Sequence, residues 1–164
     1  MKRLFAGLLA LLAALTLCVP AFAENDEPET AAWVISVSGQ NLDLQDLLVA
    51  PYREGDTVMV PLRAVSEALG YTVGWDPETR AITVDDEYIQ KATLCAGSAA
   101  VTFEGHLQVI DISREMENAV PTVIHEGHTY VPVEFFQEFL NDTAIDGTVI
   151  TVAPSMCEIN GTEG

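Results

Sequence analysis

Apolar and polar side chains alternate along two stretches of the chain, residues 35–44 and residues 101–109, and a glycine interrupts each stretch. In the first stretch the apolar positions are Ile35, Val37, Leu42 and Leu44. A period of two residues is typical of strands that bury one face. Each stretch is therefore predicted to form a β-hairpin, with its turn at Gly39 or at Gly105.

A short strand-like segment that stops at a proline follows each predicted hairpin, at residues 57–60 and at residues 129–131. Proline has no N–H to donate to a sheet, and its fixed φ angle suits the first turn of a helix. Pro61 and Pro132 are therefore predicted to be the junctions where a strand ends and a helix begins.

Both predicted helices are short, at residues 62–69 and 133–140, and each carries apolar residues at positions i, i+3 and i+7, on one face. These positions are Leu62, Val65 and Leu69 in the first helix and Val133, Phe136 and Leu140 in the second. Gly70 and Asn141 come next, and these residue types best tolerate the left-handed conformation that ends many helices. Helices of two turns are marginal alone, so both are expected to pack their apolar faces onto a sheet.

A second hairpin is predicted after each helix, because turn-forming residues stand between two strand-like segments. Asp76-Pro77 fits the first two positions of a type I turn between residues 71–75 and 81–84. Asp146-Gly147 is a tight hairpin signal between residues 143–145 and 148–152.

These elements occur twice in the same order, which indicates an internal repeat. The predicted fold is α+β, with two β-hairpin/strand/short-helix/hairpin repeats, residues 33–87 and 88–153, in mostly antiparallel sheets and packed with a pseudo-twofold relation. Arg63 and Glu134 occupy equivalent positions at the starts of the two helices. If the repeats pack about a twofold axis, these two side chains are expected to form an ion pair.

The first 23 residues have the pattern of a secretory signal peptide. Lys2 and Arg3 precede an apolar run over residues 4–19, and Ala21-Phe22-Ala23 provides small side chains at both positions that a signal peptidase recognises. An uncleaved membrane anchor is the alternative. The mature protein is thus expected to be secreted, either extracellular or associated with the cell wall, with a disordered acidic leader over residues 24–32 and a flexible tail over residues 154–164.

The charge of the chain excludes some classes of partner. The formal net charge is −18, from 7 basic and 25 acidic residues. Removal of Lys2 and Arg3 with the signal peptide would leave 5 basic residues and a net charge of −20. Nucleic acid and anionic membranes are therefore not expected as partners, because both recruit basic side chains. A basic partner or divalent cations would be favoured.

Two cysteines remain after the predicted cleavage, Cys95 and Cys157. In an oxidising exterior they are a candidate disulfide. Free thiols are the alternative, because sequence spacing does not show whether the two Cα atoms approach within bonding range.

Residues 60–76, with the sequence VPLRAVSEALGYTVGWD, and Ile82-Thr83-Val84 after them resemble the copper amine oxidase N-terminal-like domain family, also called the stalk domain. The resemblance covers most of residues 34–152. It is weaker in the second repeat, where residues 133–136 read VEFF in place of a leucine-arginine pair and the Trp-Asp hairpin is absent.

The resemblance implies a secreted or cell-surface bacterial module that stands apart from any catalytic domain. Pro61, Arg63, Gly70, Trp75, Pro132 and Glu134 are read as structural residues. The chemistry of copper amine oxidases needs three copper-binding histidines and a tyrosine-derived quinone in their catalytic domain, and no such set is found in this sequence. No cofactor is expected.

His125 and His128 are the best candidates for metal ligands, because two imidazoles flank Glu126. The alternative is that the segment is an ordinary turn, since Arg53 and Asp56 stand at the same positions in the first repeat. His106 is expected to face water. Residues 85–87 offer acidic groups for calcium, but they read better as a charged connector between the repeats.

Trp75 and Tyr71 are either an exposed aromatic patch for a glycan or, as we expect, packed beneath the Asp76-Pro77 turn. No motif for nucleophilic or acid–base catalysis is found. The sequence therefore predicts a non-catalytic binding or spacer module that engages an envelope protein or a cell-wall polymer. A metal-binding protein that uses His125 and His128, and an unrecognised hydrolase, are the alternatives.

Overall fold

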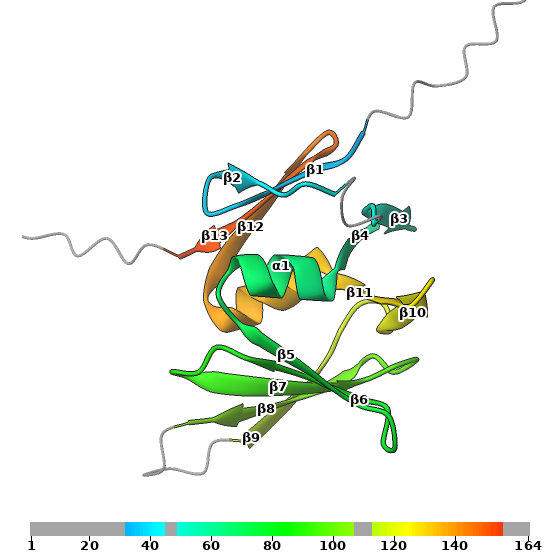
Figure 1. Cartoon of the computed structure of the whole chain (residues 1–164), viewed down its shortest axis with the longest axis vertical. Coiled ribbons are helices and arrows are strands. Elements are labelled where there is room, and N and C mark those ends of the chain that lie inside the picture. The colour runs from blue at the N-terminus through cyan, green and yellow to red at the C-terminus, as the bar shows by residue number, and fades with distance from the viewer. Residues whose placement is uncertain (1–31, 45–48, 107–112, 156–164) are drawn as a thin grey trace, which may run out of the picture. The chain divides into compact units, whose positions relative to one another are not determined.

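Three β-sheets and two short helices make up the part of the chain that the structure describes (Figure 1). The structure is a computed structural model, and it describes residues 32–44, 49–106 and 113–155. All of these residues belong to one unit, residues 31–164. The predicted signal peptide, the leader up to residue 31 and the tail from residue 156 lie outside the described residues. In the parts that are described, no helix is long and apolar enough to span a membrane.

The first sheet joins the first and last strands of the unit. Its strands are, in spatial order, β12 (Asn141–Asp146), β13 (Val149–Pro154), β1 (Val34–Val37) and β2 (Gln40–Asn41). β1 and β13 run parallel, and every other strand pair described is antiparallel. The hairpin predicted around Gly39 forms, but its second strand stops at Asn41. Leu42 and Leu44 lie beyond it, partly buried against the core.

The second sheet joins the two proline-terminated strands. Its strands are, in spatial order, β10 (Val123–His125), β11 (His128–Pro132), β4 (Thr57–Pro61) and β3 (Tyr52–Glu54). β4 and β11 are antiparallel, and Val60 lies opposite Val131. Both predicted strands are therefore confirmed. The turns before these two strands both contain two residues, Gly55-Asp56 and Glu126-Gly127, so the second turn begins one residue earlier in the aligned sequences than the first.

The third sheet contains a strand that the turn signals did not predict. Its strands are, in spatial order, β5 (Thr72–Asp76), β6 (Ala81–Asp85), β7 (Gln90–Cys95), β8 (Ala100–Gly105) and β9 (Ser113–Glu117). β7 lies between the hairpin that ends the first predicted repeat and the strands of the second. The hairpin predicted over residues 101–109 is wrong in its second strand, because β8 pairs with β7 on one side and with β9 on the other. Residues 107–112 lie outside the described residues.

The two helices begin at the predicted prolines. α1 (Leu62–Ala68) follows Pro61, and η1 (Val133–Phe139), a 3₁₀ helix, follows Pro132. Gly70 has a φ angle of 85°, as predicted for a residue that ends a helix. The prediction for Asn141 was wrong, because Leu140 carries the left-handed conformation, with a φ angle of 57°.

The buried face of η1 also differs from the prediction. A 3₁₀ helix has three residues per turn, so residues at i, i+3 and i+6 share a face. Val133, Phe136 and Phe139 are accordingly buried, together with Phe135. Leu140 is 60% exposed. The second helix therefore buries Phe139 where an α-helical period predicted Leu140.

A single hydrophobic cluster connects the helices with all three sheets. Aromatic rings dominate it beneath η1, where Phe135 packs against Phe103 of β8. Asn141 is 3% exposed, and its amide group donates to the carbonyl oxygens of Phe136 and Phe139, at 3.0 and 3.1 Å. The same nitrogen lies 2.9 Å from Tyr71 Oη, so its two N–H groups are shared among three acceptors. Asn141 therefore ends η1 with its side chain.

The predicted mostly antiparallel sheets and two short helices are confirmed. The predicted ion pair between Arg63 and Glu134 is wrong, because Arg63 pairs with Glu67 of its own helix, at 3.1 Å. Glu134 lies exposed in the first turn of η1. Glu67 is four residues from Arg63 in the same helix, and side chains at this spacing lie next to each other on the helix surface.

Candidate functional site

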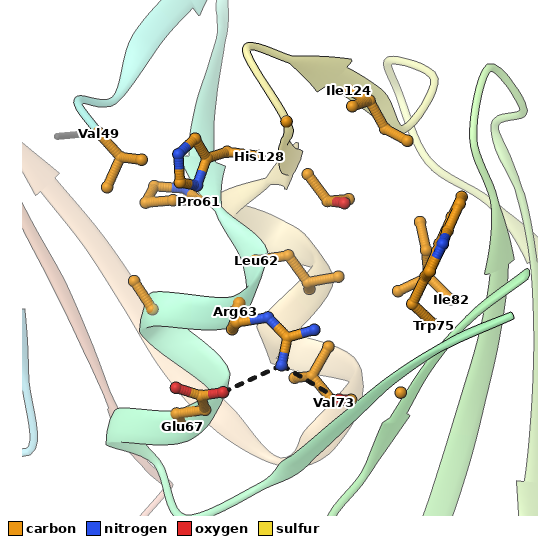
Figure 2. Close-up of a pocket in the computed structure, with 14 residues that line it drawn as sticks. Val49, Pro61, Leu62, Arg63, Glu67, Val73, Trp75, Ile82, Ile124 and His128 are labelled. Carbon is orange, nitrogen blue, oxygen red and sulfur yellow. Dashed lines mark hydrogen bonds and ion pairs between the residues drawn. The ribbon is translucent and has the colours of Figure 1, made fainter. Parts of the chain in front are cut away.

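An open groove of about 500 Å³ lies between α1, the β5–β6 hairpin and the β10–β11 hairpin (Figure 2). Its inner surface is apolar, with the fully buried Leu62 and the almost fully buried Ile82. Trp75 and Ile124 stand at its rim, and these side chains are 45% and 41% exposed. Large apolar side chains that remain exposed beside a concave surface are typical of binding sites.

Trp75 is placed at the groove by the pleat of β5. A glycine precedes it, and a Cβ atom at Gly74 would lie 2.4 Å from the side-chain hydroxyl of Thr83, which is opposite it on β6. Trp75 itself is 45% exposed. The expected packing of Trp75 beneath the Asp76-Pro77 turn is therefore wrong. Tyr71 does not join Trp75 in a patch, because its ring packs on Phe139 with 5.3 Å between centroids.

Arg63 links the helix side of the groove to the sheet side (Figure 2). Its Nη1 contacts Glu67 Oε1 at 3.1 Å and donates to the carbonyl oxygen of Val73 on β5 at 3.2 Å. Pro61 precedes the first residue of α1, Leu62, and Arg63 is the second residue of the helix and lies exposed. The ion pair is solvent-exposed, with more than half of each side chain accessible, so it contributes little to stability.

His125 and His128 lie directly opposite each other at the end of the β10–β11 hairpin. The turn between them is made by Glu126 and Gly127, with φ angles of 50° and 82°, as a type I′ turn requires. His128 lines the groove. Neither histidine belongs to a cluster of three or more metal-ligating side chains among the described residues. The conformation of residues 125–128 is thus explained by the hairpin alone. Metal binding by His125 and His128 stays a prediction.

The described residues do bring one such cluster together, at Asp85, Asp86 and His106. Asp86 is 8% exposed, and its Oδ1 accepts the backbone N–H groups of Tyr88, Ile89 and Gln90. His106 is exposed, as expected, and its Nε2 lies 2.7 Å from Asp85 Oδ1. These acidic groups form a structured turn between β6 and β7 rather than a charged connector.

The Asp85 carboxyl makes this turn sensitive to acid. Partial burial acts to raise its pKa, but the Glu87 N–H, His106 and Lys91 stabilise the carboxylate and hold the pKa below its usual value. A lowered pKa stabilises the fold above the unfolded value of about 3.9, and this contribution is lost as the pH falls through the folded pKa.

We therefore expect Asp85→Asn to lower the free energy of unfolding at pH 7 by up to about 1 kcal/mol, and this difference to shrink as the pH falls below about 3.9. Urea unfolding of both proteins across this pH range measures the difference. Glu115→Gln, an exposed carboxylate on β9, is the control. A difference that does not change with pH would contradict the role given to Asp85.

The disulfide prediction is left open. Cys95 ends β7 as an exposed free thiol, and Cys157 lies outside the described residues.

Sequence patterns identified some residues of the groove and missed others. Arg63, Trp75 and His128 stood out by residue type. Ile82 and Ile124 did not, since both belong to ordinary strand segments and only the packing of three distant hairpins and a helix brings them to one groove.

Comparison with known proteins gives a family and one distant relative. The family model described as the copper amine oxidase N-terminal domain matches residues 36–152. A protein of Brevibacillus choshinensis described as a protease inhibitor is 29% identical over 161 residues. This match covers 97% of the chain but 45% of the relative, so the chain spans less than half of that protein. No solved structure matches the chain significantly.

Proposed function

Because the chain belongs to the family of the copper amine oxidase N-terminal domain, as the match over residues 36–152 shows, we propose that it is a secreted, non-catalytic module that binds a protein partner in the groove beside α1. Secretion rests on the signal-peptide pattern of residues 1–23. The duplication is also part of the proposal, and the antiparallel pairing of Val60 with Val131 supports its pseudo-twofold relation.

The observation that carries the binding function is the groove itself. Its floor is apolar, and the ionisable side chains among its lining residues are Arg63, Glu67 and His128. Arg63 and Glu67 neutralise each other. Such a surface suits apolar side chains of a protein better than the hydroxyl groups of a wall polymer, which need many polar partners. The distant relative is described as a protease inhibitor, and a protein with that description binds another protein.

A peptide-display library and an array of cell-wall glycans, both applied to residues 24–164, test the proposal. Reproducible enrichment of peptides that fail to bind the Trp75→Ala variant is the expected result. Tyr88→Ala, which removes a side chain that is 83% exposed on another turn, should leave the enriched set unchanged. Binding of glycans alone, or peptides that bind equally to Trp75→Ala, would overturn the protein-binding function.

A spacer function is favoured by a separate observation, the parallel pairing of β1 with β13. The two strands pair from Val34 opposite Val149 to Val37 opposite Val152. The chain therefore enters the first sheet at one end of this pair and leaves it at the other. Tension between the two ends would load the inter-strand hydrogen bonds side by side, so that they must break together.

We expect a higher unfolding force when handles are attached at residues 32 and 155 than when they are attached at residues 32 and 147. The second geometry pulls at the turn beside the start of β13 and unzips the same strand pair one bond at a time. Single-molecule force spectroscopy, with Cys95 replaced by serine in both proteins, makes the comparison. Equal forces in both geometries would contradict the spacer function.

A further inference from the structure

We propose that the partner enters the groove as an extended polypeptide segment and adds a strand to the free edge of β5. This inference rests on the proposed protein-binding function and specifies its mode. Strand addition needs a sheet edge whose backbone groups are unpaired, open to solvent and accompanied by a pocket for side chains.

β5 is an edge strand, since β6 is its neighbour on one side and no strand of the described residues lies on the other. In an antiparallel pair, a residue points both its N–H and its C=O toward the partner strand or both away from it. The carbonyl oxygen of Val73 accepts a hydrogen bond from Arg63 on α1, so Val73 points away from β6. Trp75, two residues further, points the same way.

This free edge opens into the groove. Val73, Gly74 and Trp75 all line it, and Ile124 of the β10–β11 hairpin stands at the rim as well. The backbone N–H and C=O of Trp75 make no hydrogen bond outside the β5–β6 pair in the part of the chain that is described. An added strand would find a donor and an acceptor at Trp75 and an acceptor at Val73.

In the free protein, Arg63 covers this edge with a hydrogen bond to the Val73 carbonyl oxygen. Exposed sheet edges promote aggregation, and proteins protect them with charged side chains. The guanidinium group donates a hydrogen bond to the Val73 carbonyl oxygen. This hydrogen bond is weak, because more than half of the Arg63 side chain is exposed and water screens its interactions. A peptide N–H can therefore replace it at little cost, and the side chain keeps Glu67 as a partner.

The chemistry of the groove defines the segment that fits. Its backbone must be extended, because alternate residues have to meet Val73 and Trp75. An apolar side chain should lie over Leu62 and Ile82 beside the Trp75 ring. Basic residues should flank this apolar core, since the chain carries a net charge of −18 and would attract them over a long range.

The test uses the peptides recovered from the display library, synthesised with capped ends. Hydrogen exchange measured by NMR should show a fast Trp75 amide in the free protein that becomes at least about tenfold slower with saturating peptide. The Gly74 amide, which faces β6, should change little. N-methylation of alternate peptide nitrogens should weaken binding by at least about tenfold in one register and much less in the other.

Two variants separate strand addition from simple contact. Arg63→Ala removes the competitor for the Val73 carbonyl and should tighten peptide binding several-fold, whereas Arg80→Ala, an exposed arginine of the β5–β6 turn, should not. A different result would contradict strand addition and leave the binding function intact. In that case peptides bind and Trp75→Ala abolishes their binding, but the Trp75 amide keeps its hydrogen-exchange rate and N-methylation weakens binding equally in both registers. If Arg63→Ala weakens peptide binding, then a peptide N–H does not replace Arg63 at the Val73 carbonyl oxygen, and that part of the proposal is wrong.

Discussion

Phe135→Ala should lower the free energy of unfolding by about 3–5 kcal/mol, a large fraction of the stability of a domain this size. Phe135 is 1% exposed. Its ring contacts Phe103, Phe136 and Phe139, at centroid distances of 6.3, 5.3 and 5.5 Å. Removal of the ring leaves a cavity between η1 and the third sheet, and its neighbours are too tightly packed to fill it. Chemical denaturation of residues 24–164, followed by circular dichroism, measures the change.

Two further variants define how this loss is read. Phe135→Leu keeps most of the buried volume and should cost clearly less than Phe135→Ala. Ile145→Ala removes an apolar side chain that is 38% exposed on β12, and it should change stability by less than about 1 kcal/mol. A loss for Phe135→Ala no larger than that for Ile145→Ala would show that the aromatic cluster does not hold η1.

Asn141→Asp should cost about 3 kcal/mol or more at pH 7, although the two side chains have almost the same size. The amide nitrogen donates to two backbone carbonyl oxygens and to Tyr71 Oη. A carboxylate there would face the two carbonyl oxygens with no proton to donate. The side-chain oxygen of Asn141, Oδ1, is also buried without a hydrogen-bond partner among the described residues. The Tyr71 hydroxyl could donate to the carboxylate, but no cationic side chain in the described part of the chain hydrogen-bonds at this position, so the buried charge would remain uncompensated.

Acid should partly rescue this variant. A protonated carboxyl group regains one donor and loses its charge, so the deficit of Asn141→Asp relative to the unmodified protein should shrink as the pH falls toward 4. Asp142→Asn, the opposite change at the exposed neighbouring position, is the matched control and should have a small effect. A deficit that is equally large at pH 4 and pH 7 would contradict the buried-charge explanation.

Local backbone preferences made much of the fold predictable. Pro61 and Pro132 ended strands and began helices, because a ring that fixes φ and removes a donor has the same effect in any surroundings. Asp76-Pro77 and Asp146-Gly147 formed the turns of their hairpins. The family could be recognised for the same reason, since residues 60–76 carry these local signals at fixed spacing. The match over residues 36–152 confirms that resemblance.

Features that depend on packing could not be predicted in this way. The second helix has the 3₁₀ period, which buries Phe139 and exposes Leu140. No turn signal was recognised beside β7, so this strand between β6 and β8 was not predicted. The polar residue that ends η1 is Asn141, but through its side-chain amide rather than through its backbone conformation. In each case distant neighbours decide between local alternatives of similar energy.

The sequence by itself determined where both helices begin, where the two proline-terminated strands end, which residues are turn formers, the acidic character of the chain and its family. Tertiary structure alone decided that Arg63 meets Val73 and Glu67 instead of Glu134, and that Trp75 stays exposed. It also decided that Leu62, Ile82 and Ile124 share one groove. The physical reason is that turn and helix preferences act over a few residues, whereas a groove is made by side chains that are dozens of residues apart and meet only after the sheets have packed.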